Sequence, residues 1–281
     1  MDYLLNLSLR FYERWQPDAI INRKLKQAKS NDFEKLSGTI ADCQISKDRK
    51  FITKKIRHDQ KEKDISDLYL IGQIVGSSVV NTWTDAAMLE YDLVHEACIQ
   101  EEFYQLWKNS DIIKIPKVKS FTDDSIVMEF VDWPRLADVL NNKELFENAV
   151  KSTAYFFYNS INRGNIVHGD ISLFNILVDP KSKNGRICVI DYGMTCRLES
   201  KDVNNLNNIT EVDNLKGDPS KIFDAWSTEG FQFSWEWWEE LNLMEKKSSD
   251  ISGVFIRSVV SLTRIACIGN LIVPKSFNNY L

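Results

Sequence analysis

An aspartate and an asparagine stand five positions apart in a loop between apolar segments, and a second aspartate follows the next apolar run. Asp170 and Asn175 lie within residues 166–179, and Asp191 ends the apolar run 187–190. Carboxylate and amide oxygens are the hard ligands that Mg²⁺ takes in proteins. In phosphoryl transfer a protein mainly positions the reactants and neutralises charge on the phosphate oxygens. The three side chains therefore predict phosphoryl-transfer chemistry, with Asp170 orienting an acceptor hydroxyl and Asn175 and Asp191 holding metal.

A short hairpin is the element that must bring these side chains together. Residues 176–178 and 187–190 are apolar and rich in β-branched types, and the segment 179–185 between them is rich in turn-forming residues. Pairing across this turn would place Asn175 at the entry and Asp191 at the exit, at one end of the ribbon. The alternative is a hairpin whose polar residues are incidental, which the combined H-G-D-x4-N and D-Y-G spacing disfavours.

The bulk composition excludes several classes of protein. A hydrophobic content of 43% and a charged content of 27% are ordinary for a globular chain of 281 residues. The net charge of −5 carries no basic field for nucleic acid, so we expect no nucleic-acid partner. No apolar stretch is long enough for a transmembrane segment. The five cysteines form no C-x-x-C pair, which indicates a reducing, cytoplasmic location.

The order of predicted elements indicates an α+β protein with two lobes. Strands are predicted at 39–45, 50–56, 118–121 and 125–131, and a helix at 85–107. Beyond residue 132 the chain reads as mainly helical, apart from the hairpin.

A phosphotransferase also needs a cation for the nucleotide phosphates and a carboxylate to hold that cation. Lys54, in the strand 50–56, is the predicted cation. Ile52 shares its face, because strand side chains alternate, and would lie against adenine. The helix 85–107 offers Glu96 beside its apolar stripe and Glu90 near its start, so the partner of Lys54 stays open between the two.

The remaining predicted nucleotide contacts are Ser37, Gly38, Thr39, Met128, Glu129 and Phe130. The first three form a loop with a single glycine, whose backbone amides can approach phosphate less freely than those of a glycine-rich loop. Met128 would limit the size of the site at its back. The last two belong to a strand that leads to a hinge, where backbone groups would read the edge of adenine.

Together these stretches resemble the UbiB-type atypical kinases, a family linked to ubiquinone biosynthesis. The resemblance is carried by the loop 37–43, the strand 52–57, the E-x-D…E-A segment 89–97, the strand 127–129, and the H-G-D and D-Y-G motifs. It implies a two-lobed protein-kinase-like fold with ATP and Mg²⁺ as cofactors. The small N-lobe would hold an antiparallel sheet and one main helix, and the C-lobe would be mainly helical.

The same resemblance implies one kinase-like domain. An N-terminal helical extension would span 1–32, the N-lobe 33–131 and the C-lobe 132–281. Residues 1–36 hold no K-x-G-Q signature, which the family carries in an N-terminal extension. The acceptor therefore stays open between a protein, a small molecule and a lipid-pathway metabolite, and kinase stays open against ATPase.

The same motifs also resemble those of other kinase families. His168-Gly169-Asp170, with Met128–Phe130, is also similar to RIO-type atypical kinases, and H-G-D occurs in sugar and aminoglycoside kinases. Gly169 replaces the arginine of H-R-D and no A-P-E motif follows Asp191, which disfavours control by an activation loop. The rival from another class is a nucleotide-binding pseudokinase scaffold, which has no need of the full Lys–Glu–Asp–Asn–Asp set.

Overall fold

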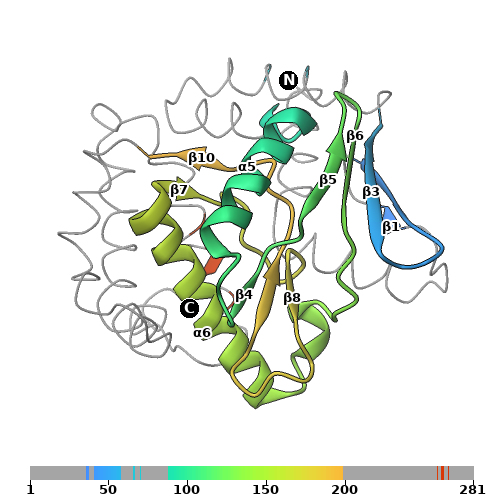
Figure 1. Ribbon diagram of the computed structural model, residues 1–281. Coiled ribbons are helices and arrows are strands. Elements are labelled where there is room, and N and C mark those ends of the chain that lie inside the picture. The colour runs from blue at the N-terminus through green and yellow to red at the C-terminus, as the bar shows by residue number, and fades with distance from the viewer. Residues whose placement is uncertain are drawn as a thin grey trace, which may run out of the picture.

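The computed structural model describes residues 36–37, 41–57, 66, 70, 88–198, 258, 261, 262 and 265. In this part the protein is a mixed α+β structure, in which an antiparallel sheet comes first and helices with short strands follow (Figure 1). The predicted extension 1–32, Gly38 and Thr39 lie outside the described residues. The helices within the described ranges include none that is both long and apolar enough to cross a membrane.

Five strands form the antiparallel sheet in the order β1-β2-β3-β6-β5. Their bounds are β1 Leu36–Ser37, β2 Ala41–Ile45, β3 Phe51–Ile56, β5 Val118–Phe121 and β6 Ser125–Glu129. The predicted strands are confirmed, although β6 ends two positions before the expected end, Val131. Alternation sets the two faces of β3, where Lys54 is half-buried and Lys55 is exposed.

Helix α5 spans Leu93–Trp107 and begins at a polar cap. The Asp92 side chain accepts a hydrogen bond from the His95 backbone N–H at 2.8 Å, which satisfies a donor of the first turn. Met88 and Leu89 are helical, but Glu90 and Tyr91 after them form a turn. The prediction of one continuous helix through 88–107 was therefore wrong, because the Asp92 cap starts a new helix.

The rest of the chain is organised around a long helix and the hairpin. Its elements are η1 Leu136–Val139, α6 Lys143–Gly164, β7 Ile166–Val167, β8 Ile176–Val178, β9 Ile187–Val189 and β10 Cys196–Arg197. Strands β8 and β9 pair antiparallel, which confirms the predicted hairpin. A two-residue strand, β4 at Ile113–Lys114, adds to β9 in parallel and was not predicted, because such a short segment carries no periodicity.

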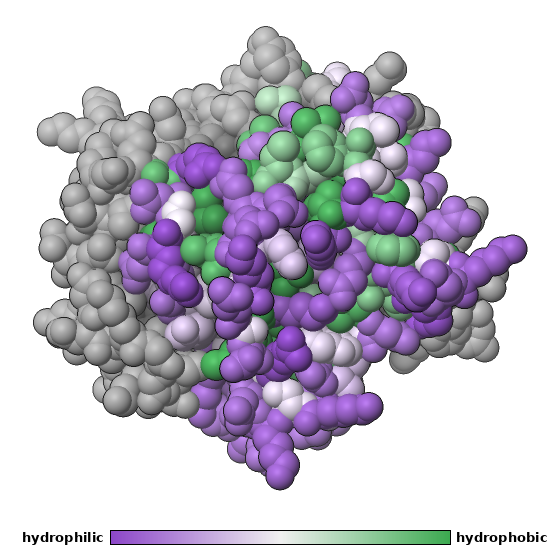
Figure 2. Space-filling view, viewed as in Figure 1, coloured by the Kyte–Doolittle hydropathy of each residue, from purple (hydrophilic) through white to green (hydrophobic). Residues whose placement is uncertain are grey.

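Helix α5 lies between the five-stranded sheet and α6 and packs against both (Figure 1). Its Leu93 and Ala97 belong to the smaller apolar cluster beneath the sheet. Its Phe103 and Trp107 belong to the large cluster shared with α6 and the hairpin. Mainly polar side chains cover the described surface on the face shown in Figure 2. Packing on two sides gives α5 a fixed position relative to both β3 and the hairpin.

Candidate functional site

The open end of the hairpin brings Asn175 and Asp191 together, as predicted. Ile176 faces Val189 across the ladder, and the Ile190 N–H donates to the Asn175 carbonyl at 3.0 Å. Asn175 therefore immediately precedes one strand, and Asp191 follows the other after a single residue. Both side chains depend on a hairpin whose six strand residues are all buried.

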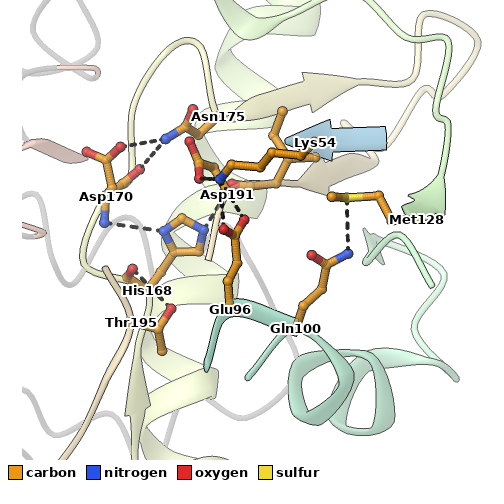
Figure 3. Close-up of polar contacts among 10 residues, drawn as sticks. Lys54, Glu96, Gln100, Met128, His168, Asp170, Asn175, Asp191 and Thr195 are labelled. Carbon is orange, nitrogen blue, oxygen red and sulfur yellow. Dashed lines mark hydrogen bonds and ion pairs between the residues drawn. The ribbon is translucent and has the colours of Figure 1, made fainter. Parts of the chain in front are cut away.

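Asn175 and Asp170 form one hydrogen-bonded unit (Figure 3). Asn175 Nδ2 donates to the Asp170 backbone oxygen at 3.0 Å and to Asp170 Oδ2 at 2.7 Å. The Asn175 side chain is buried, and its backbone N–H donates to Ser172 Oγ at 3.2 Å. Because the amide nitrogen is committed to two oxygens of Asp170, Oδ1 is the Asn175 atom that suits a hard cation.

Asp191 stands in the left-handed region, with φ of 69°. Such backbone is uncommon outside glycine and costs free energy that the surroundings must supply. The buried Tyr192 anchors the segment, since its hydroxyl donates to the Val189 carbonyl at 2.8 Å. A Cβ on Gly193 would lie 3.0 Å from Glu90 Cα, so glycine permits this close approach. The result is a constrained backbone with the Asp191 carboxylate 45% exposed.

The side chain of His168 links the Asp170 loop to the Asp191 loop. The Asp170 backbone N–H donates to His168 Nδ1 at 3.3 Å, so Nε2 is the protonated nitrogen and donates to the Ile190 carbonyl at 3.2 Å. The ring is buried and packs near Phe103 and Tyr192, with centroids 6.3 Å and 5.0 Å away. A neutral imidazole thus sets the spacing of the two loops.

Lys54 joins the sheet to α5 and to the hairpin (Figure 3). Its Nζ donates to both carboxylate oxygens of Glu96 at 2.8 Å and to Asp191 Oδ1 at 2.8 Å. The Lys54 side chain is 15% exposed and that of Glu96 is 1% exposed. Of the two predicted carboxylates, Glu96 is therefore the one bound to Lys54, and Glu90 lies in the turn beside Gly193.

The electrostatics of this cluster keep Lys54 charged. Burial by itself lowers the pKa of the Lys54 ammonium, but the charges of Asp191 and Glu96 outweigh burial and raise that pKa above its ordinary value. Burial raises the pKa of the Glu96 carboxyl, and Lys54 opposes that rise. The cluster is thus a buried cation held by one buried and one solvent-facing carboxylate.

The predicted hinge residues are partly engaged inside the protein. The Glu129 N–H donates to the Lys117 carbonyl and the Phe130 N–H to the Lys50 carbonyl, each at 2.9 Å. The Glu129 side chain accepts from Lys114 Nζ at 2.7 Å. Both N–H groups are thus paired within the protein, and the expectation that backbone groups near the hinge read the edge of adenine stays a prediction.

Three residues near these positions were not singled out from the sequence. Cys43 and Ile45 of β2 face Lys54 and Ile52 of β3 across the ladder. Correct strand register would have found both. The third, Gln100, lies one turn after Glu96 on α5 and is buried. Its position one turn after Glu96 places it on the same packed face of α5, and a polar residue on that face was the signal in the sequence.

The described residues contain no cluster of three or more His, Cys, Asp or Glu side chains that could hold a metal ion. Asn175 and Asp191 instead offer two oxygen ligands at one end of the hairpin. This pair fits Mg²⁺, which keeps several waters and takes phosphate oxygens in place of a complete protein cage. The donor chemistry therefore suits a metal that arrives with a phosphorylated ligand.

Part of this chain is similar in sequence to a curated protein. RIO-type serine/threonine-protein kinase Rio1 of Methanocaldococcus jannaschii is 33% identical over 92 residues, which are 31% of this chain and 30% of Rio1. The chain thus spans less than a third of that curated relative.

A solved structure is similar over a longer stretch. The complex of Rv3197 with erythromycin from Mycobacterium tuberculosis has a TM-score of 0.52 at 13% identity, over 85% of this chain and 75% of that one. At this identity the likeness concerns the fold.

The family itself is identified by a match to the ABC1 atypical kinase-like domain over residues 53–224. The matched segment covers more than half of the chain and includes Lys54, Glu96, Asp170, Asn175 and Asp191. The resemblance to the UbiB-type family is thereby confirmed, and the chain belongs to the ABC1 atypical kinase-like domain family.

Proposed function

We propose that this chain is an ATP- and Mg²⁺-dependent phosphotransferase of the atypical-kinase type. Residues 33–131 would form the nucleotide-binding N-lobe and residues 132–281 the C-lobe, within one kinase-like domain. The observation that carries the proposal is the contact of Lys54 Nζ with both Glu96 and Asp191. This contact places a cation beside a metal-ligand candidate, which is where nucleotide phosphates would need both.

Lys54 is assigned to the phosphates and Glu96 to holding Lys54. Glu96 projects from α5 and is buried, so water does not compete with the Lys54 ammonium for its carboxylate. Asp191 is the more exposed carboxylate, and its oxygens can turn from Lys54 to a metal ion. Bound Mg²⁺ would neutralise charge on the phosphate oxygens at Asn175 and Asp191.

Asp170 is assigned to the acceptor. Asn175 Nδ2 holds its carboxylate at 2.7 Å, and the bond from the Asp170 N–H to His168 holds its backbone. A carboxylate fixed in this way can orient a hydroxyl and accept its proton as the phosphoryl group leaves ATP. The acceptor hydroxyl would belong to a protein, a small molecule, a lipid-pathway metabolite or water.

The adenine base of the nucleotide is assigned to the five-stranded sheet. Ile52 on β3 and Ile45 opposite it on β2 provide an apolar surface, and Met128 is the Cα partner of Ile52 on β6. Ser37, in β1, leads into the loop with Gly38 and Thr39 that would cover the phosphates. Contacts from Glu129 and Phe130 would use groups other than their N–H donors.

The test is release or transfer of the γ-phosphate by the purified full chain with Mg²⁺ and γ-labelled ATP. Asp170→Asn should lower turnover by a factor of about 100 or more, the range for losing a general base. ATP affinity should change little, because Asp170 touches the acceptor rather than the nucleotide. Asp123→Asn, in the exposed turn between β5 and β6, is the matched control.

Equal turnover by the wild type and Asp170→Asn would overturn the assignment of Asp170. If the wild type binds ATP with Mg²⁺ but shows no turnover, the protein is a pseudokinase scaffold and not an enzyme. No response to ATP at all would overturn both.

A further inference from the structure

Gln100 is a buried polar residue that the proposed chemistry does not use. It lies on α5 one turn after Glu96 and is 1% exposed. Glu96 and Gln100 both project from α5, Glu96 toward Lys54 and Gln100 toward Met128 (Figure 3). The two residues therefore face different parts of the candidate site from one helix.

The Gln100 amide nitrogen makes two contacts. Nε2 donates to the Pro116 carbonyl at 2.7 Å and lies 3.5 Å from Met128 Sδ. The first bond fixes the orientation of the amide, because a carbonyl at this distance needs the nitrogen and not the oxygen. The amide thus presents an N–H to the thioether of Met128, which is a weak acceptor.

The other half of the amide has no protein partner among the described residues. Gln100 Oε1 is buried and receives no hydrogen bond from the protein. Buried polar atoms nearly always have a partner, and one that lacks it destabilises the fold. Methionine or leucine would fill a similar volume and remove this oxygen, but either would take the donor from the Pro116 carbonyl, so packing alone does not account for glutamine at this position.

Met128 is the side chain that Gln100 contacts, and it needs a restraint. Methionine has three rotatable bonds and a polarisable sulfur, so it adapts to the space around it. Met128 is 8% exposed and is the Cα partner of Ile52 in the sheet. Its orientation therefore decides how much space is left beside Ile52, where the base is assigned.

We propose that Gln100 is a positioning residue that holds Met128 across the back of the nucleotide site and thereby excludes purines with a bulky substituent on the 6-amino group. The inference rests on the proposed function and deepens it, since it names the determinant of base size. Gln100 acts through Met128 and touches neither phosphate nor metal ligand. Its replacement should change which nucleotide binds and leave the Lys54–Glu96 pair in place.

The experiment measures the dissociation constants of ATP and of N6-benzyl-ATP, both with Mg²⁺, by calorimetry on the full chain. Gln100→Ala should lower the ratio of the N6-benzyl-ATP constant to the ATP constant by about tenfold or more, because Met128 can then move aside. Gln105→Ala is the matched control, an exposed glutamine on the same helix that bonds Glu101. It should keep the wild-type ratio.

Gln100→Met separates positioning from packing, and it covers the case in which Gln100→Ala does not fold. It preserves side-chain volume and exchanges the unpaired Gln100 Oε1 for a Pro116 carbonyl that has lost its donor, so its melting temperature should stay close to that of the wild type. The ratio of dissociation constants should nevertheless fall by about threefold or more. A merely structural role predicts no change in this ratio.

A Met128→Leu background tests whether Gln100 acts through the sulfur. Leucine offers no acceptor to the amide, so adding Gln100→Met there should leave the ratio within about twofold of Met128→Leu alone. The inference is overturned if Gln100→Met keeps the wild-type ratio, or if it lowers the ratio equally in both backgrounds. Either result with normal ATP binding by the wild type leaves the proposed function standing, whereas a wild type that binds no ATP overturns the proposed function as well.

Discussion

Lys54 Nζ lies 2.8 Å from Asp191 Oδ1, although 137 positions separate the two residues. The same nitrogen binds Glu96, so one cation joins β3, α5 and the loop after β9. The contact also gives the Asp191 carboxylate a counter-charge. The backbone of Asp191 lies in the left-handed region.

Glu96→Gln should destabilise the fold as well as weaken ATP binding. It leaves Lys54 with one carboxylate, Asp191, which is half-exposed. We expect a loss of about 3 kcal/mol in the free energy of unfolding, the low end for breaking a buried ion pair, because Asp191 still partners Lys54. Urea denaturation measures this loss, with Glu101→Gln, five positions further along α5, as the control. A loss as small as that of the control would show that the pair carries no stability.

Lys54→Met tests the dependence of the cluster on pH. The pKa of Lys54 is raised in the folded protein above the ordinary value of 10.5, since Asp191 and Glu96 overcome the effect of burial. A raised pKa gives a stabilisation that is complete below the unfolded value and is lost as pH rises through the folded value. The difference in unfolding free energy between the wild type and Lys54→Met should therefore stay constant from about pH 7 to about pH 10.

That difference should shrink only in more alkaline solution. Urea denaturation of the two proteins at a series of pH values provides the measurement. A difference that already falls near neutral pH would mean that the Lys54 ammonium is not held by the two carboxylates.

Gly193→Ala should disturb the Asp191 loop. The added Cβ would lie 3.0 Å from Glu90 Cα, so one of the two backbones must shift. Overpacking of this kind costs about 1–3 kcal/mol of stability. Because Asp191 is only two positions away, we also expect a loss of Mg²⁺-dependent ATP affinity, which calorimetry with and without Mg²⁺ would detect.

Gly185→Ala provides the comparison for that variant. Gly185 has φ of 65°, and a Cβ there would lie 2.3 Å from the Asn148 carbonyl carbon. This turn is at the opposite end of the hairpin from Asn175, so the change should lower the melting temperature with little effect on the ATP affinity of the folded protein. Equal losses of affinity in both glycine variants would show a general effect of instability and not one on the Asp191 loop.

Cys43 should resist alkylation near neutral pH. Burial raises the pKa of the Cys43 thiol to about 11, with Lys54 opposing the rise and Asp191 and Glu96 adding to it. Only the thiolate reacts, so iodoacetamide at about pH 8 should label the exposed Cys98 long before Cys43. Peptide mass spectrometry distinguishes the two. Modification of Cys43 as fast as Cys98 would contradict the placement of its thiol beside the Lys54 cluster.

Local patterns were sufficient to predict much of the site. Asn175 and Asp191 meet because a single hairpin holds them, and a hairpin is written in a continuous stretch of sequence. The half-buried position of Lys54 follows from the alternation of β3. Glu96 lies on the packed side of α5, as the helical periodicity of its apolar neighbours indicated.

What could not be predicted depends on contacts between distant segments. Only the cap at Asp92 separates the turn at Glu90 from α5, and a propensity pattern does not locate such a break. The N–H groups of Glu129 and Phe130 bind carbonyls of Lys117 and Lys50, which the strand pattern alone did not reveal. Gln100 gains its meaning only when Met128 is placed beside it.

The most direct test of the account is the Mg²⁺-dependence of ATP binding by the wild type and Asp191→Asn. Asn is nearly the same size as Asp, so the fold should persist. It lacks the negative charge that binds the metal and Lys54. Calorimetry should show that Mg²⁺ tightens ATP binding to the wild type by about tenfold or more and has little effect on the variant. Equal tightening by Mg²⁺ in both proteins would contradict the assignment of Asp191, and with it the central claim about this site.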